Sequence, residues 1–182
     1  MLTIIAGPMF AGKTTCLVEF AKTLQKGSYI VFKPDIDSRF ATDACVTHDG
    51  LSVQSQNLKS NAPHFPKFTA KIKTVLLDEL NFFNFETLFP EIQKLLELNI
   101  SVVGSGLLYD SQKKPFGATK QLSEIAHKFV ELFAICDGCG GKANQSYTKV
   151  VKTSQIALGA ADSYGACCEK CWGKFKPKKI SR

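Results

Sequence analysis

The stretch GPMFAGKT, from Gly7 to Thr14, fits the Walker A pattern of two glycines, a lysine and a hydroxyl residue at fixed offsets. The apolar run Leu2 to Ala6 before it predicts a short buried strand, and Thr15 to Gln25 after it carries apolar residues at helical spacing. A strand, a glycine loop and a helix in this order form the context that a phosphate-binding loop requires. An ordinary glycine turn before a helix is the plainer interpretation, and this context disfavours it.

The residue types of this loop suit nucleotide phosphates. Gly7 and Gly12 are predicted to let the backbone curl so that its N–H groups point at an anion, and the start of the helix adds its positive dipole end. Lys13 would reach the outer phosphates, and the hydroxyl of Thr14 would join a magnesium ion. The predicted phosphate-binding set is Gly7, Pro8, Met9, Phe10, Ala11, Gly12, Lys13 and Thr14.

Length and charge limit the possible functions. The 182 residues suffice for one α/β domain with a small appendage. A net charge of +7 suits an acidic partner, either a nucleoside triphosphate or a nucleic acid. We expect no export signal, because the first apolar run breaks at once into the phosphate loop, and no stretch is long enough to span a bilayer. The seven cysteines are therefore expected in a reducing cytoplasm, where paired spacings favour metal binding.

Further strands and helices continue the α/β pattern. Strands are predicted at Ser28 to Phe32, Thr74 to Leu77, Ile100 to Val103 and Leu132 to Ile135, and helices at Glu86 to Leu98 and Leu122 to Phe129.

The segments Lys33 to Gly50 and Gly104 to Gly117 are predicted to be loops. The first is long for a compact domain and holds Arg39 and His48. Arg39 could offset phosphate charge in a transition state, or it could be a solvated surface arginine. His48 is more simply a hydrogen-bonded loop residue than a catalyst.

Two acids close the buried run TVLL. In phosphate-loop enzymes an acidic residue at the end of a buried strand holds magnesium, directly or through water, and Asp78 has that position. Glu79 beside it could accept the proton of an attacking hydroxyl. A pair of solvated acids is the alternative, which the phosphate loop disfavours.

The cysteines form two CxxC pairs. Cys136 with Cys139 and Cys168 with Cys171 suit a tetrahedral zinc site, which would be structural because four thiolates leave no open position. The separation between the pairs exceeds the usual range, so we expect a β-ribbon or loop between them. Cys167 stands next to Cys168, and the CxxC register favours Cys168.

The order of these motifs resembles the cellular type II thymidine kinases. The motifs are GPMFAGKT, LLDELNFF, KPFG, and two CxxC pairs flanking GAADSYGACCEKC, and their spacing matches over nearly the whole chain. The resemblance implies an α/β fold, a P-loop nucleotide kinase core with a parallel sheet, plus a small zinc-binding lasso domain that closes over the nucleoside. Residues 1–135 would form the ATP-binding domain and residues 136–182 the lasso domain.

The resemblance also implies an activity. It is transfer of the γ-phosphoryl of ATP to the 5′-hydroxyl of thymidine, and also of deoxyuridine, which yields dTMP in pyrimidine salvage for DNA synthesis. The implied cofactors are ATP, Mg²⁺ and a structural Zn²⁺. A cytoplasmic homotetramer inhibited by dTTP is expected, with no nucleic-acid or membrane partner.

The resemblance assigns roles residue by residue. Glu79 becomes the general base, and Asp37 and Arg39 match a family Asp and Arg near the phosphates. The magnesium region would comprise Thr14, Asp37 and Asp78. The implied nucleoside-binding residues are Met9, Phe82, Leu107, Phe116, Thr148, Ile156 and Tyr164, with lasso main-chain groups around Ile156 to Tyr164 on the base edge.

The chain departs from the family pattern near the predicted acceptor site. The family usually writes DEGQFF, whereas Leu80 and Asn81 replace the Gly and Gln here. Leucine resists positive φ, so we expect the turn after Glu79 to differ. Leu108 stands in place of an aspartate, and Ser111 in place of a common aromatic. These changes predict a reshaped acceptor pocket or an altered nucleoside choice.

A rival interpretation is a nucleic-acid-binding protein that uses ATP as a switch. Its four-cysteine ribbon and the tail Lys174 to Lys179 would grip phosphates. Such a ribbon should interleave basic and aromatic residues, yet Cys136 to Gly141 nearly lacks them. An adaptor without catalysis is disfavoured because Lys13, Thr14 and the acidic pair are all present.

Overall fold

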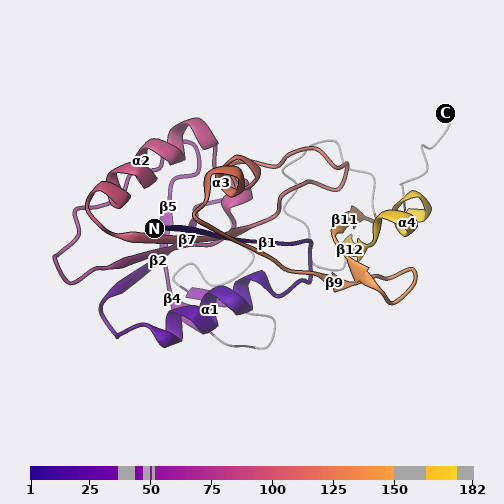
Figure 1. Ribbon diagram of the computed structural model, residues 1–182, viewed down its shortest axis with the longest axis horizontal. Coiled ribbons are helices and arrows are strands. Elements are labelled where there is room, and N and C mark those ends of the chain that lie inside the picture. The colour runs from indigo at the N-terminus through magenta and orange to yellow at the C-terminus, as the bar shows by residue number, and fades with distance from the viewer. Residues whose placement is uncertain (37–43, 47–49, 51, 150–162, 176–182) are drawn as a thin grey trace.

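A six-stranded parallel sheet forms the centre of the molecule (Figure 1). The computed structural model describes residues 1–36, 44–46, 50, 52–149 and 163–175. The strand order is β5-β2-β6-β7-β1-β8, and every neighbouring pair is parallel. The bounds are β1 Leu2–Ala6, β2 Tyr29–Pro34, β5 Gln56–Leu58, β6 Thr74–Leu77, β7 Ser101–Gly106 and β8 Lys128–Glu131.

Helices cover both faces of the sheet. Helix α1 (Lys13–Thr23) lies on one face, and α2 (Phe85–Glu97) and α3 (Thr119–Ile125) lie on the other (Figure 1). Successive residues of β6 alternate between the two cores, since Leu76 packs with the α1 side and Leu77 with the α2 side. Both faces are therefore apolar, as expected for a buried parallel sheet. No described helix has the length and hydropathy needed to cross a bilayer.

The predicted loop from Lys33 to Gly50 is wrong at its start and at residues 44–46. Strand β2 continues to Pro34, and a short strand, β3 (Ala44–Val46), pairs antiparallel with β4 (Ser52–Gln54). Three residues are too few to show a two-residue period, so this strand could not be recognised from the sequence.

The predicted elements before the cysteines are also corrected. Helix α3 ends at Ile125, and the sheet has an unpredicted sixth strand, β8. Of the predicted strand Leu132 to Ile135, Ala134–Ile135 is a strand, β9, which lies outside the main sheet. Phe129 therefore belongs to a strand and not to the predicted helix. Strand β8 lies at the sheet edge and is largely exposed, so it lacks the apolar run that a buried strand shows.

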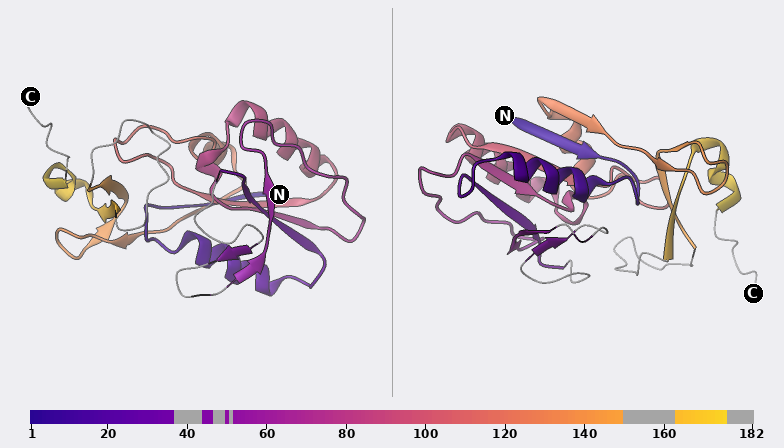
Figure 2. Two further views of the ribbon diagram at one scale, coloured as in Figure 1. Left: turned by 180° about the vertical axis from the view of Figure 1, so that it is seen from behind. Right: turned by 90° about the horizontal axis from the view of Figure 1, so that it is seen from below.

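A smaller unit follows the sheet. It contains β9 (Ala134–Ile135), β10 (Lys142–Ala143), β11 (Gln145–Thr148), β12 (Tyr164–Cys167), α4 (Glu169–Trp172) and the 3-10 helix η3 (Gly173–Phe175). Strands β11 and β12 pair antiparallel, which confirms the β-ribbon expected between the two cysteine pairs. The unit has its own apolar cluster and lies beyond the end of β1 where the phosphate loop begins (Figures 1 and 2).

Candidate active site and metal centre

The phosphate loop turns at two residues with positive φ. Gly12 has φ 76° and caps the start of α1, while Phe10 has φ 64°. The Ala11 N–H donates to the Pro8 carbonyl at 3.4 Å, and the Lys13 ammonium donates to the same carbonyl at 2.8 Å. The curl therefore needs a glycine at position 12, as predicted, and also a strained non-glycine residue at position 10.

Gly7 serves a different purpose from the one predicted. It does not have positive φ, and a Cβ placed on it would lie 2.5 Å from the Leu132 carbonyl oxygen. The Leu132 N–H in turn donates to the Ala6 carbonyl at 2.7 Å. Position 7 is thus restricted to glycine by close packing between the loop and the segment that enters the small unit.

The Asp78 carboxylate is the centre of a buried hydrogen-bond network. Asp78 is 6% exposed at the end of β6. Its Oδ2 accepts from the Thr14 hydroxyl and the Cys45 thiol, each at 3.1 Å. Its Oδ1 accepts from the Ser105 hydroxyl and from the Glu79 N–H, the latter at 3.0 Å. The structure therefore brings Thr14 and Asp78 together, and four donors satisfy the two oxygens of the buried carboxylate.

Two of these partners were missed in the sequence. Ser105 lies at the carboxyl end of β7, the neighbour of β6, and a polar residue at such a strand end was the signal that could have identified it. Cys45 is 3% exposed, and its thiol bonds Asp78. Burial, followed by the Asp78 charge, raises the pKa of Cys45 well above its ordinary range, so it is a neutral donor.

Glu79 has a strained backbone that separates it from β6. Its φ of 53° and ψ of 49° are left-handed, and it caps the 3-10 helix η1 (Leu80–Phe82). The positive φ thus falls on Glu79 and not on Leu80. Leu80 is fully buried on Gly104, where an added Cβ would lie 2.5 Å from Leu80 Cδ1. The substitution of Gly by Leu after the acidic pair therefore fits because position 104 has no side chain.

Asn81 fixes the chain that follows β7. Its Oδ1 accepts from the Leu107 N–H at 2.9 Å, and its side chain is 1% exposed. Its Nδ2 has no hydrogen-bond partner among the described residues. A Cβ on Gly106 would lie 3.1 Å from Asn81 Oδ1, and one on Gly117 would lie 2.1 Å from the Asn81 carbonyl oxygen. Close backbone packing thus lets the amide of Asn81, which is one methylene shorter than the family's glutamine, reach the Leu107 N–H.

Four of the seven predicted nucleoside-binding residues form two pairs. The rings of Phe82 and Phe116 meet edge to face with centroids 5.7 Å apart. Thr148 and Tyr164 are directly opposed in the β11–β12 ladder.

Two more of these residues have backbone links to the site. Leu107 follows β7 and is tied to Asn81. The Met9 N–H donates to the Ser146 hydroxyl on β11 at 2.9 Å, which joins the phosphate loop to the small unit. The predicted residues Asp37, Arg39 and Ile156 lie outside the described residues.

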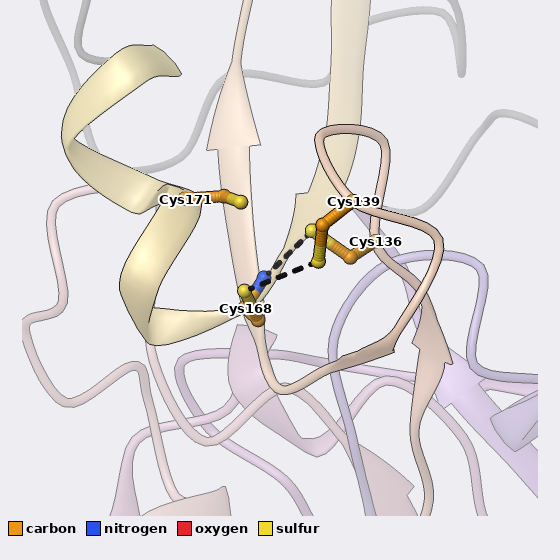
Figure 3. A group of neighbouring side chains, drawn as sticks. All are labelled: Cys136, Cys139, Cys168 and Cys171. Carbon is orange, nitrogen blue, oxygen red and sulfur yellow. Dashed lines mark hydrogen bonds between the residues drawn. The ribbon is translucent and has the colours of Figure 1, made fainter.

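Four cysteine sulfurs converge in the small unit (Figure 3). Cys136 and Cys139 come from the turn after β9, and Cys168 and Cys171 come from the start of α4. The four Sγ atoms lie within 4.8 Å of one another, and Cys139 and Cys168 are 3.7 Å apart. A tetrahedron with metal–sulfur bonds of about 2.3 Å has edges of about 3.8 Å. The cluster therefore has the dimensions of a four-cysteine metal site.

Geometry distinguishes the ligand candidates from Cys167. The Cys168 N–H donates to Cys136 Sγ at 3.2 Å, and this bond lowers the pKa of Cys136 to about 6. Cys167 is fully buried, does not belong to the cluster, and burial raises its pKa to about 11. Because the Cys168 sulfur is one of the four converging sulfurs and the Cys167 sulfur is not, the geometry selects Cys168 over its neighbour.

Asp137 braces the turn that carries the first cysteine pair. Its Oδ2 accepts from the Tyr147 hydroxyl at 2.9 Å and from the Ala166 N–H at 3.2 Å. Burial, together with this bond to Asp137, raises the pKa of Tyr147 to about 12. The turn between the two ligands is thus tied to both strands of the ribbon.

Known proteins of one family are similar to this chain over nearly its whole length. The family described as thymidine kinase matches residues 1–172. A thymidine kinase of Pseudothermotoga lettingae is 31% identical over 97% of each chain. That of Bacteroides thetaiotaomicron is 34% identical over 94% of this chain and 86% of its own, and that of Metamycoplasma arthritidis is 32% identical over 100% and 95%.

The solved structures are far less similar. One of Pif1 helicases at forked double-stranded DNA has a TM-score of 0.41 and 16% identity, over 71% of this chain and 39% of its own, which carries no argument about function. The chain belongs to the thymidine kinase family.

Proposed function

We propose that this protein transfers the γ-phosphoryl group of ATP to the 5′-hydroxyl of thymidine. The observation that carries the proposal is the 3.1 Å contact between the Thr14 hydroxyl and Asp78, with Glu79 directly after it. This contact puts the phosphate loop opposite an acidic strand end, the arrangement used by phosphate-loop enzymes for phosphoryl transfer. Membership in the thymidine kinase family supports ATP and thymidine as the substrates.

The proposed roles follow from position. Lys13 offsets charge on the outer phosphates, and the loop from Gly7 to Thr14 binds the triphosphate. The N–H groups at the start of α1 would contribute most, because Pro8 has no N–H and those of Met9 and Ala11 donate within the protein. Glu79 accepts the proton of the 5′-hydroxyl, and its left-handed backbone ends the strand that carries Asp78 and begins η1. Arg39 is proposed to stabilise the transferring group. Phe82 and Phe116 are proposed walls for the base.

Two metal ions are part of the proposal. Thr14 and Asp78, with Asp37, would hold Mg²⁺, which when bound would neutralise charge on the phosphates. Zinc is the proposed ion of Cys136, Cys139, Cys168 and Cys171, because four thiolates at tetrahedral spacing suit a structural zinc. These cysteines would then hold the small unit together while taking no part in the reaction.

The remaining expectations of the resemblance stand as proposals. They are use of deoxyuridine, inhibition by dTTP, a homotetramer and a cytoplasmic location. Two domains, 1–135 and 136–182, also remain a proposal; the apolar cluster of the small unit supports a second unit, although that cluster already includes Ala134. Nucleic-acid binding through the ribbon is the second candidate, and no feature of the described ribbon favours it over the kinase.

The test is ADP release with ATP, magnesium and each deoxynucleoside in turn. The kinase reaction predicts stimulation by thymidine, and by deoxyuridine to some degree, with little from purine nucleosides. Retention on single-stranded DNA that falls with salt, together with no nucleoside stimulation, would instead support the nucleic-acid-binding candidate.

A further inference from the structure

The segment Leu108 to Phe116, predicted as a loop, is a closed hairpin. The Phe116 N–H donates to the Leu108 carbonyl at 3.1 Å, and Tyr109 bridges Pro115. Asp110 Oδ1 accepts from two backbone N–H groups inside the turn, at 2.8 and 2.9 Å. Because these bonds satisfy the turn internally, the hairpin can transmit a displacement from its tip to its base.

The tip of this hairpin touches the small unit. Lys113, in a left-handed conformation with φ 64°, places Nζ 2.5 Å from Glu169 Oε1 and 4.4 Å from the ring centroid of Trp172. Both partners lie on α4, between and beside the cysteines Cys168 and Cys171. The ion pair is partly solvated, so the contact with the tryptophan ring adds to a modest electrostatic attraction.

The base of the hairpin contacts the proposed nucleoside pocket. Phe116 is 7% exposed and packs edge to face on Phe82. Phe82 belongs to η1, the helix that Glu79 caps. A chain of direct contacts thus runs from the metal-ligand helix through Lys113 and the hairpin to the wall of the acceptor site.

We propose that Lys113 is a positioning residue that couples metal occupancy of the four-cysteine site to nucleoside binding. This rests on the proposed function. Metal binding orders α4, α4 holds the hairpin tip through Glu169 and Trp172, and the hairpin in turn sets the position of Phe116. Coupling between two binding sites is reciprocal, so thymidine must strengthen metal binding by the same factor by which the metal strengthens thymidine binding.

The test compares K113M with K114M, since Met keeps the aliphatic stem and Lys114 is the exposed neighbour in the same turn. Calorimetry gives the Kd for thymidine of the zinc-loaded proteins. Competition with a chromogenic chelator gives zinc affinity with and without saturating thymidine. We expect K113M to weaken thymidine binding about fivefold or more, with KM for ATP and kcat nearly unchanged. We expect thymidine to raise zinc affinity in the wild type and K114M, and not in K113M.

The conservative variant K113R should restore most of both effects, because Arg keeps the charge and the ring contact. Equal thymidine affinity and equal zinc affinity in K113M and the wild type would overturn the coupling while leaving the kinase proposal in place. A wild-type protein that does not bind thymidine at all would overturn both. Loss of zinc affinity in K113M that is the same with and without thymidine would show a merely structural role and reject the coupling.

Discussion

At the scale of single residues, Asp78 depends on donors from three other segments of the chain. Ser105 is fully buried, and its hydroxyl bonds the carboxylate from the adjacent strand. A hydrogen bond to a charged group contributes about 1.5–3 kcal/mol, so S105A should destabilise the protein by about that amount. Urea unfolding measures it, with S52A at an exposed position of β4 as the control. An unchanged midpoint for S105A would contradict this assignment.

Leu80 and Gly104 form the second residue-scale test. L80A removes a fully buried side chain and should cost about 2–5 kcal/mol of unfolding free energy. G104A should also destabilise, because its Cβ would lie 2.5 Å from Leu80 Cδ1. The double variant should lose less than the sum, since L80A removes the atoms that G104A would meet. Strictly additive losses in denaturant unfolding would show that the two positions are not in contact.

At the scale of elements, the ribbon and α4 define which thiols bind metal. C168S should reduce bound zinc from one ion per chain to a small fraction, because it removes one of four sulfurs within 4.8 Å of one another. C167S should keep the full zinc content, since Cys167 lies outside that cluster. Metal analysis of the purified variants gives both values. The reverse pattern would mean that α4 begins in a different register.

Elements and contacts could be predicted from the sequence where the residues that form them are close together in the chain. Strand β1, helix α1 and strand β6 with its acidic end were predicted correctly, because the residues of each are adjacent in sequence. The Ser105 and Cys45 contacts with Asp78 depend on strand pairing, which no single segment specifies. Strand β8 was not predicted, because an exposed strand at the edge of a sheet needs no continuous apolar run.

The site itself shows the same division. The cysteine pairs were predictable from their spacing, whereas the choice between Cys167 and Cys168 needed the geometry of the ribbon. Leu80 was expected to alter the turn after Glu79, and the sequence could not show that it packs against Gly104, which has no side chain. The Lys113 contact with α4 joins residues more than fifty positions apart in the chain, so no local pattern around Lys113 predicts it.

At the scale of the whole molecule, the central sheet and the small unit have separate apolar clusters. Removing the metal should therefore unfold the small unit first. Trp172 is the only tryptophan and lies on α4, so its fluorescence should shift to the red on chelation. Far-UV circular dichroism should retain most of its signal, because the sheet and helices α1 to α3 are held by their own apolar clusters, which do not include the metal ligands. A cooperative loss of both signals at one chelator concentration would show that the two units fold as one.

The central claim is that the protein is a kinase whose base is Glu79. The most direct measurement is transfer of labelled γ-phosphate from ATP to thymidine by the wild type and by E79Q, with E97Q at an exposed end of α2 as the control. The account predicts labelled dTMP from the wild type and E97Q, and a kcat for E79Q lower by about a hundredfold or more with thymidine binding retained. Wild-type rates in E79Q, or no labelled nucleotide from the wild type, would contradict it.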